Sequence, residues 1–188
     1  MNRLYTTALF ALLVACIAYG LIEWKQSHQQ IIKTIDTELT PDFIAESLKS
    51  NTFSETGALS HIIDAQRMEH YSGIEVTHFE FPSLTLYPEN KDVPWKISSK
   101  EGTLFKNNRV SLKNRVKLES TDPDSLIQQI HGKSIELDLN TNIISSEQAI
   151  VILGNGFTVY GSGLIVDINT KQMTLTEHVQ TIYQKTQK

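Results

Sequence analysis

Apolar and polar residues alternate along most of the chain after Gly57. Successive side chains of a strand point to opposite faces, so a period of two indicates strands that bury one face. Turn-forming residues interrupt the alternation at intervals of roughly 8 to 16 residues, and no amphipathic helical window follows Ser54. The pattern predicts an all-β sandwich, jelly roll or open barrel.

The clearest regularity is a repeat near the C-terminus. The segment Ile130–Thr141 reappears as Val159–Thr170, with apolar residues on the same alternate positions in both copies. Asp138 matches Asp167, and an Asn-Thr pair closes each copy. A repeat of about this length is one supersecondary unit that cannot bury its apolar face alone.

The two copies continue to match beyond their Asn-Thr pairs, where Ile144 falls on Met173 and Ile150 falls on Val179. Asn-Thr is suited to a tight reversal of the chain. We therefore predict stacked antiparallel hairpins between residues 130 and 183.

The N-terminal segment Leu4–Ile22 is apolar and carries no charge. As a helix it would span roughly 28 Å, enough for the hydrocarbon core of a bilayer. Arg3 precedes it, and this positive charge favours an N-terminus on the cytoplasmic side of the membrane. We predict an uncleaved single-span anchor. Two alternatives stay open, a cleaved signal peptide and a lipoprotein cut before Cys16 and acylated there.

Residues 26–54 are polar and weakly patterned, and we interpret them as a tether. Within it, Pro41-Asp42 is a helix start signal and predicts a short helix over Phe43–Lys49. The predicted organisation is a cytoplasmic N-terminus and transmembrane anchor over residues 1–25, the tether over residues 26–54, and a β domain over residues 55–188.

The sequence contains few of the residue patterns that are typical of catalysis, metal binding or nucleic-acid binding. A formal net charge of −4 argues against binding to nucleic acid, which requires a basic surface. The six histidines lack the convergent spacing of metal ligands, and no nucleophile elbow or phosphate-binding loop opens a helix. Asp138 and Asp167 recur with the repeat, so we interpret them as equivalent solvent-facing residues. We expect no enzyme, no metal and no cofactor.

Several short motifs occur in a characteristic order after the apolar anchor, namely Thr56–His61, Ala65–Gln66, Glu69–Tyr71, Pro94–Ile97 and Arg115–Leu118. In this order, and with repeated hairpins at the end, the chain closely resembles the LptC family of lipopolysaccharide export proteins of Gram-negative bacteria. It departs from some relatives in having Thr56, rather than an acidic residue, before Gly57. The resemblance does not extend clearly to the tether.

The resemblance implies a twisted open β jelly roll of antiparallel strands in the periplasm, preceded by one N-terminal transmembrane helix in the inner membrane. It implies that lipopolysaccharide arrives from the ABC transporter formed by LptB, LptF and LptG and leaves to periplasmic LptA. It also implies edge-to-edge docking of β domains and no catalytic residue.

On this basis we assign candidate sites. The lipid groove is assigned to alternate apolar positions, namely Leu59, Ile63, Ile135, Leu137, Leu139, Leu164, Val166 and Ile168. The transporter-facing edge is assigned to Gly57 and Leu59. The LptA-facing edge is assigned to Met173, Leu175, Val179 and Ile182. A glycine bend is assigned to Gly154, Gly156, Gly161 and Gly163, of which Gly154 or Gly156 is the second important glycine of the family.

Two other interpretations remain open at this point. The inward residues could simply fill a dry core. Alternatively, the chain could be a structural lipoprotein, acylated at Cys16, that scaffolds envelope proteins without carrying lipid.

Overall fold

The computed structural model describes residues 40–90 and 92–183. The chain divides into two compact units, Met1–Pro41 and Asp42–Lys188, and the second is the β domain described below. No helix among the described residues is long and apolar enough to span a membrane. The predicted anchor and the acylation site at Cys16 lie outside the described residues.

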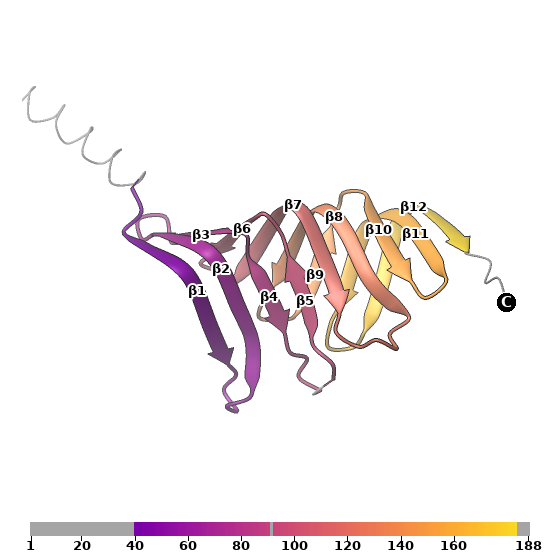
Figure 1. Cartoon of the computed structure of the whole chain (residues 1–188), viewed down its shortest axis with the longest axis horizontal. Helices are drawn as coiled ribbons and strands as arrows, with labels where there is room; N and C mark the ends of the chain where they lie inside the picture. Colours follow the sequence, from indigo (N-terminus) through magenta and orange to yellow (C-terminus); the bar gives the residue numbers. More distant parts are fainter. Residues whose placement is uncertain (1–39, 91, 184–188) are drawn as a thin grey trace, which may run out of the picture. The chain divides into compact units, whose positions relative to one another are not determined.

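The β domain consists of antiparallel strands. They are β1 (Phe43–Phe53), β2 (Leu59–Tyr71), β3 (Val76–Glu80), β4 (Ser83–Leu86), β5 (Trp95–Ser98), β6 (Glu101–Phe105), β7 (Arg109–Ser120), β8 (Ile127–Asp138), β9 (Ile143–Ser146), β10 (Ile150–Gly154), β11 (Phe157–Asp167) and β12 (Gln172–Tyr183). In Figure 1 they run side by side from indigo β1 to yellow β12. The prediction of an all-β antiparallel domain is confirmed; the jelly-roll arrangement stays a prediction.

The pairing divides this sheet into two layers. The long strands β2, β7, β8 and β11 pair along one half with the short strands β4, β5 and β10, which we call layer A. Along the other half they pair with β3, β6 and β9, which we call layer B. Each long strand therefore belongs to both layers, and the sheet folds along the middle of these strands.

Apolar residues of both layers form one hydrophobic cluster. Strand register places them in rows that cross the strands. The row in layer A is Ile63, Leu84, Ile97, Leu118, Ile130, Ile152 and Val159. The row in layer B is Leu104, Val110, Leu137, Ile144, Val166 and Met173. Apolar side chains thus run almost from one end of the stack to the other.

The predicted hairpins of the repeat are confirmed, because tight turns join β8 to β9 and β11 to β12. Asp138 Oδ1 accepts hydrogen bonds from the backbone N–H groups of Asn140 (2.9 Å) and Thr141 (3.3 Å). Asp167 Oδ1 accepts the same two bonds in its own turn, at 2.9 and 3.2 Å. The repeated carboxylates therefore close equivalent turns, as such side chains commonly do.

The prediction of a short helix over Phe43–Lys49 is wrong, since these residues begin strand β1. Much of the segment assigned to the tether, Phe43–Phe53, is therefore part of the sheet. β1 pairs along its length with β2, and most of its side chains are exposed. A strand with little burial on either face has no reason to alternate apolar and polar residues, so its sequence lacks the period-two signal.

Candidate functional site

Two hollows open into the space between the layers. The N-terminal hollow, of about 430 Å³, is lined by residues that include Leu48, His61, Ile63, Phe79, Leu104 and Leu139. The C-terminal hollow, of about 320 Å³, is lined by residues that include Trp95, Leu126, Ile127, Val166, Ile168 and Met173. Both are mainly apolar, as expected of a site for a hydrophobic ligand.

The middle of the domain is closed between these hollows. Leu112, Leu118, Ile130 and Ile135 are fully buried, with no exposed surface. Apolar residues that line the hollows, among them Leu48 and Leu104 in one and Trp95 and Met173 in the other, are only partly buried. The interior therefore combines a dry centre with two accessible ends.

The predicted groove residues are distributed over all three regions. Ile63 and Leu139 line the N-terminal hollow, and Val166 and Ile168 line the C-terminal hollow. Ile135, Leu137 and Leu164 lie in the buried cluster. Leu59 is partly buried at the start of β2. Alternation identified inward-facing positions, but it did not separate core residues from those at the hollows.

Sequence reasoning missed several lining residues. Leu48 comes from the unpredicted strand β1, while Phe79, Leu104, Trp95 and Ile127 belong to other strands. A usable signal existed for Leu104 and Trp95, because both lie on alternating apolar positions next to turns. No local pattern distinguishes Leu48, whose inward orientation depends on its pairing with Ala65 of β2.

His61 is the titratable side chain buried in the N-terminal hollow, with 9% of its surface exposed. Burial lowers its pKa below the ordinary 6.5, because the charged imidazolium loses hydration there. The ring is therefore neutral near pH 7, in keeping with the apolar character of the hollow.

Both ends of the stack are edge strands. Among the described residues, β1 pairs only with β2, and β12 pairs only with β11. Unpaired strand edges can continue their sheet with another chain. Gly57 lies in the turn before β2, and Leu59 is inside β2, which is paired on both sides. The edge at this end is therefore β1, and the assignment of that edge to Gly57 and Leu59 has to be corrected.

The residues predicted for the other edge all lie in β12. Met173 and Leu175 are half-buried and pack against the core. Val179 and Ile182 are exposed by 55% and 48%. An edge strand thus carries both inward-facing side chains and apolar side chains in solvent.

The glycine bend coincides with an irregularity in β11. The register between β11 and β12 shifts between Tyr160 and Ser162, close to the point where β11 leaves β10 and joins β9. Gly163 has a φ of +68°, and a Cβ there would overlap Thr176 Oγ1. Gly154 instead ends β10, Gly156 lies in the β10–β11 turn, and Gly161 lies opposite Ile150.

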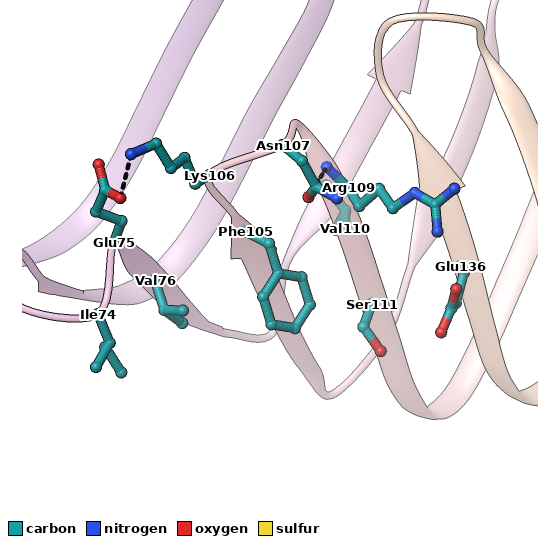
Figure 2. Close-up of a pocket in the computed structure, with 10 residues that line it drawn as sticks. All are labelled: Ile74, Glu75, Val76, Phe105, Lys106, Asn107, Arg109, Val110, Ser111 and Glu136. Atoms are coloured by element: carbon teal, nitrogen blue, oxygen red, sulfur yellow. Dashed lines mark hydrogen bonds and ion pairs between the residues drawn. The ribbon is translucent and has the colours of Figure 1, made fainter.

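A third hollow, of about 450 Å³, lies away from the core (Figure 2). Ile74, Val76 and Phe105 point away from Lys106, whose ammonium pairs with Glu75 at 2.5 Å. Arg109 lies 3.9 Å from Asp138. Three of the charged side chains that line this hollow, Glu75, Lys106 and Arg109, are thus already paired within the chain. We regard the two interior hollows as the better candidate for an apolar ligand.

Comparison with known proteins agrees with this architecture. The family model described as "Lipopolysaccharide-assembly, LptC-related" matches residues 9–184. The lipopolysaccharide export system protein LptC of Haemophilus influenzae is 26% identical, with 98% of this chain and 96% of the relative covered. LptC of Escherichia coli is 25% identical, with 89% and 86% covered.

A solved structure has a similar fold. LptH of Pseudomonas aeruginosa, described as the LptA-homologous periplasmic component of the lipopolysaccharide transport device, aligns with a TM-score of 0.52. The alignment covers 66% of this chain and 95% of that protein at 12% identity. The family match extends over nearly the whole chain, and the chain therefore belongs to the LptC-related lipopolysaccharide-assembly family.

Proposed function

We propose that this protein is a lipopolysaccharide relay of the Gram-negative envelope, anchored in the inner membrane, with its β domain in the periplasm acting as an open jelly roll. It receives lipopolysaccharide from the LptB, LptF and LptG transporter and passes it to LptA. The observation that carries this proposal is the pair of apolar rows, which cross the strands toward an edge strand at each end.

The apolar interior is suited to binding acyl chains. Both hollows are lined mainly by apolar side chains, and each buried methylene contributes about 0.8 kcal/mol to binding. The sugars and phosphates of the ligand remain in solvent. A protein with this role performs no catalysis and needs no cofactor.

The two edges provide the docking surfaces. β1 is the edge toward the transporter, because it is the first strand of the domain and no strand in the described part of the chain pairs with its outer side. β12 is the edge toward LptA. The exposure of Val179 and Ile182 supports this assignment, since isolated apolar side chains on an edge strand would gain contacts when another strand docks.

The edge assignment can be tested by placing charges on β12. Val179→Asp combined with Ile182→Asp should leave the fold intact, because both side chains are exposed. Pull-down of purified LptA by the full-length variant should fall by about tenfold or more, since charge on an edge opposes strand addition.

The matched control is Ile143→Asp with Ile165→Asp, at exposed positions of β9 and β11, which are not edge strands, and it should retain LptA as the wild-type protein does. Ile165 is 48% exposed, like Ile182. Equal retention of LptA by the edge variant and the wild-type protein would show that β12 is not the docking strand.

A further inference from the structure

The side of the domain opposite the fold line is formed by the tips of the two layers. The tips of layer A are the connections at residues 54–58, 87–90 with 92–94, 121–126 and 155–156. The tips of layer B are the turns at residues 72–75, 106–108, 139–142 and 168–171. A ligand that enters sideways between the layers has to pass between these two sets.

Within each layer the tips are joined by backbone hydrogen bonds. In layer B, Leu139 N–H donates to the Asn108 carbonyl (3.0 Å), and Ile168 N–H donates to the Asn142 carbonyl (3.2 Å). In layer A, Asn155 N–H donates to the Leu126 carbonyl (3.0 Å). These bonds stiffen each layer but do not hold the layers to each other.

One group of contacts crosses from layer A to layer B. Asn90 Nδ2 donates to the Asn169 carbonyl (3.0 Å), and Glu89 N–H donates to Asn169 Oδ1 (3.3 Å). Lys171 Nζ lies 3.0 Å from Asp92 Oδ2. We call these five residues the seam contact. Among the described residues, the hydrogen bonds and ion pairs that join a layer A tip to a layer B tip are confined to it.

The seam contact lies at the C-terminal hollow. Lys171 lines that hollow together with Val93 and Ile168. The N-terminal hollow, by contrast, is lined by Thr52 and Ser60, in the strands next to a layer A tip, and by Asn108 and Asn140 of the layer B tips. Among the described residues, no hydrogen bond or ion pair joins these two sets. Polar contacts between the tips thus join the two layers at the C-terminal hollow and not, among the described residues, at the N-terminal hollow.

The closed middle of the domain means that separation of the layers at the seam contact would affect the movement of a ligand. Acyl chains that move from the N-terminal to the C-terminal hollow must pass between fully buried residues such as Leu118 and Ile135. Close-packed cores do not admit extra methylenes without moving their walls. The layers share continuous long strands at the fold line, so they can separate only at the tips.

The hydrogen bonds and the ion pair of the seam contact are weak enough to separate readily. The side chains of Asp92 and Lys171 are 37% and 51% exposed, and an exposed ion pair contributes little net free energy because water solvates both partners. The polar bonds of Asn90 and Asn169 likewise exchange readily with water.

We propose that the seam contact is a releasable clasp between the layers, whose opening admits acyl chains to the C-terminal hollow. This inference rests on the proposed function, since it concerns how the same interior loads and unloads lipid. Closed, the clasp keeps apolar surface from water; open, it connects the two hollows along the tips.

A reversible disulfide tests the clasp. In full-length protein with Cys16→Ser, the chain's one native cysteine is removed, and Asn90→Cys with Asn169→Cys places two thiols across the seam. A photo-crosslinking residue replaces Leu104 in the N-terminal hollow or Met173 in the C-terminal hollow. Purified lipopolysaccharide is the probe. Oxidation should reduce adducts at position 173 by about tenfold or more, because the open state is removed, while adducts at position 104 persist.

The matched control pair is Asn108→Cys with Asn140→Cys. These side chains are hydrogen-bonded at 2.9 Å, but both belong to layer B tips, so their disulfide leaves the layers free to separate. Oxidation of the control should leave the adducts at position 173 unchanged, and reduction of the Asn90–Asn169 disulfide should restore the adducts at position 173. Undiminished adducts at position 173 in the oxidised Asn90–Asn169 pair would overturn the clasp. Absence of adducts at both positions in reduced protein would instead overturn the proposed lipid function.

A charge test does not depend on disulfide formation. Asp92→Lys places two cations together at the seam and should increase adducts at position 173, and the added change Lys171→Asp should return them to the wild-type level. Unchanged adducts in the single variant, or no return in the double variant, would contradict the clasp.

Discussion

The two copies of the repeat have closely similar sequences but different surroundings. Ile135 and its counterpart Leu164 are both fully buried, and each copy closes its turn with the same aspartate hydrogen bonds. The copies diverge where they continue. Ile150 is 2% exposed between β8 and β11, whereas its counterpart Val179 is 55% exposed on β12.

The difference lies in what covers each copy. The first copy has strands on both sides, because β8 pairs with β7 on one side and with β9 and β10 on the other. The second copy ends at β12, which pairs with β11 alone within the described residues. Similar residues are thus core in one place and surface in the other, and the stack stops at a strand that could be extended by another chain.

The test of this comparison with the largest expected effect is a matched pair of substitutions by alanine. Ile150→Ala should destabilise the domain by about 2–5 kcal/mol, because it leaves a cavity in a close-packed core. Val179→Ala should change stability by no more than about 0.5 kcal/mol, as expected for an exposed side chain. Urea unfolding of both variants gives the two values. Equal losses would mean that β12 is covered in the free protein.

The second test concerns a position where the two copies differ in backbone conformation. Gly163 aligns with Ser134 of the first copy and has a φ of +68°. Gly163→Ala should cost about 1–3 kcal/mol, since an L-residue in this conformation is strained and the new methyl group would overlap Thr176 Oγ1.

The control for this test is Ser134→Ala, which changes the matching position of the first copy. It should alter stability by no more than about 0.5 kcal/mol. Thermal or urea unfolding distinguishes the variants. A mild effect at Gly163 would indicate that the bend in β11 relaxes easily and does not depend on glycine.

The smallest expected effect concerns the repeated turns. Hydrogen bonding by Thr170, and next the backbone of Thr170 and Asn169, lowers the pKa of Asp167 below its ordinary 3.8, although burial opposes this. A carboxylate whose pKa is lowered on folding stabilises the protein above pH 3.8, and this contribution is lost as the pH falls through the folded-state pKa.

Asp167→Asn should therefore be slightly less stable than the wild-type protein at pH 7, with the gap closing in acid. Urea midpoints measured from pH 7 down to pH 3 follow the gap. The paired variant Asp138→Asn alters the equivalent turn of the first copy and shows whether the two turns contribute independently. A gap that is constant with pH would contradict a role for the Asp167 charge.

Prediction from sequence succeeded where the signal was local. Alternation and the Asn-Thr pairs predicted the hairpins that include β8 with β9 and β11 with β12, and Asp138 and Asp167 proved to be equivalent turn residues. Prediction failed at β1, where Pro41-Asp42 suggested a helix. A helix start signal records only local backbone preference, and pairing with β2 overrides it.

The candidate site was predicted in part for the same reason. Ile63 and Ile168 were correctly identified as inward-facing, but Ile63 lines one hollow and Ile168 the other. Alternation reports which face of a strand a residue occupies. It carries no information on how far apart the two layers lie at that point.

By itself, then, the sequence determined the strands of the repeat, the residues at their turns, and which alternate positions of each strand face the core. Each of these depends on neighbours a few positions away. Tertiary structure decided which strands became edges, where the interior is closed or hollow, and that Asn90 and Asp92 meet Asn169 and Lys171 across the seam. Those features depend on pairings between distant segments, whose geometry is set by the fold of the whole sheet rather than by any local pattern.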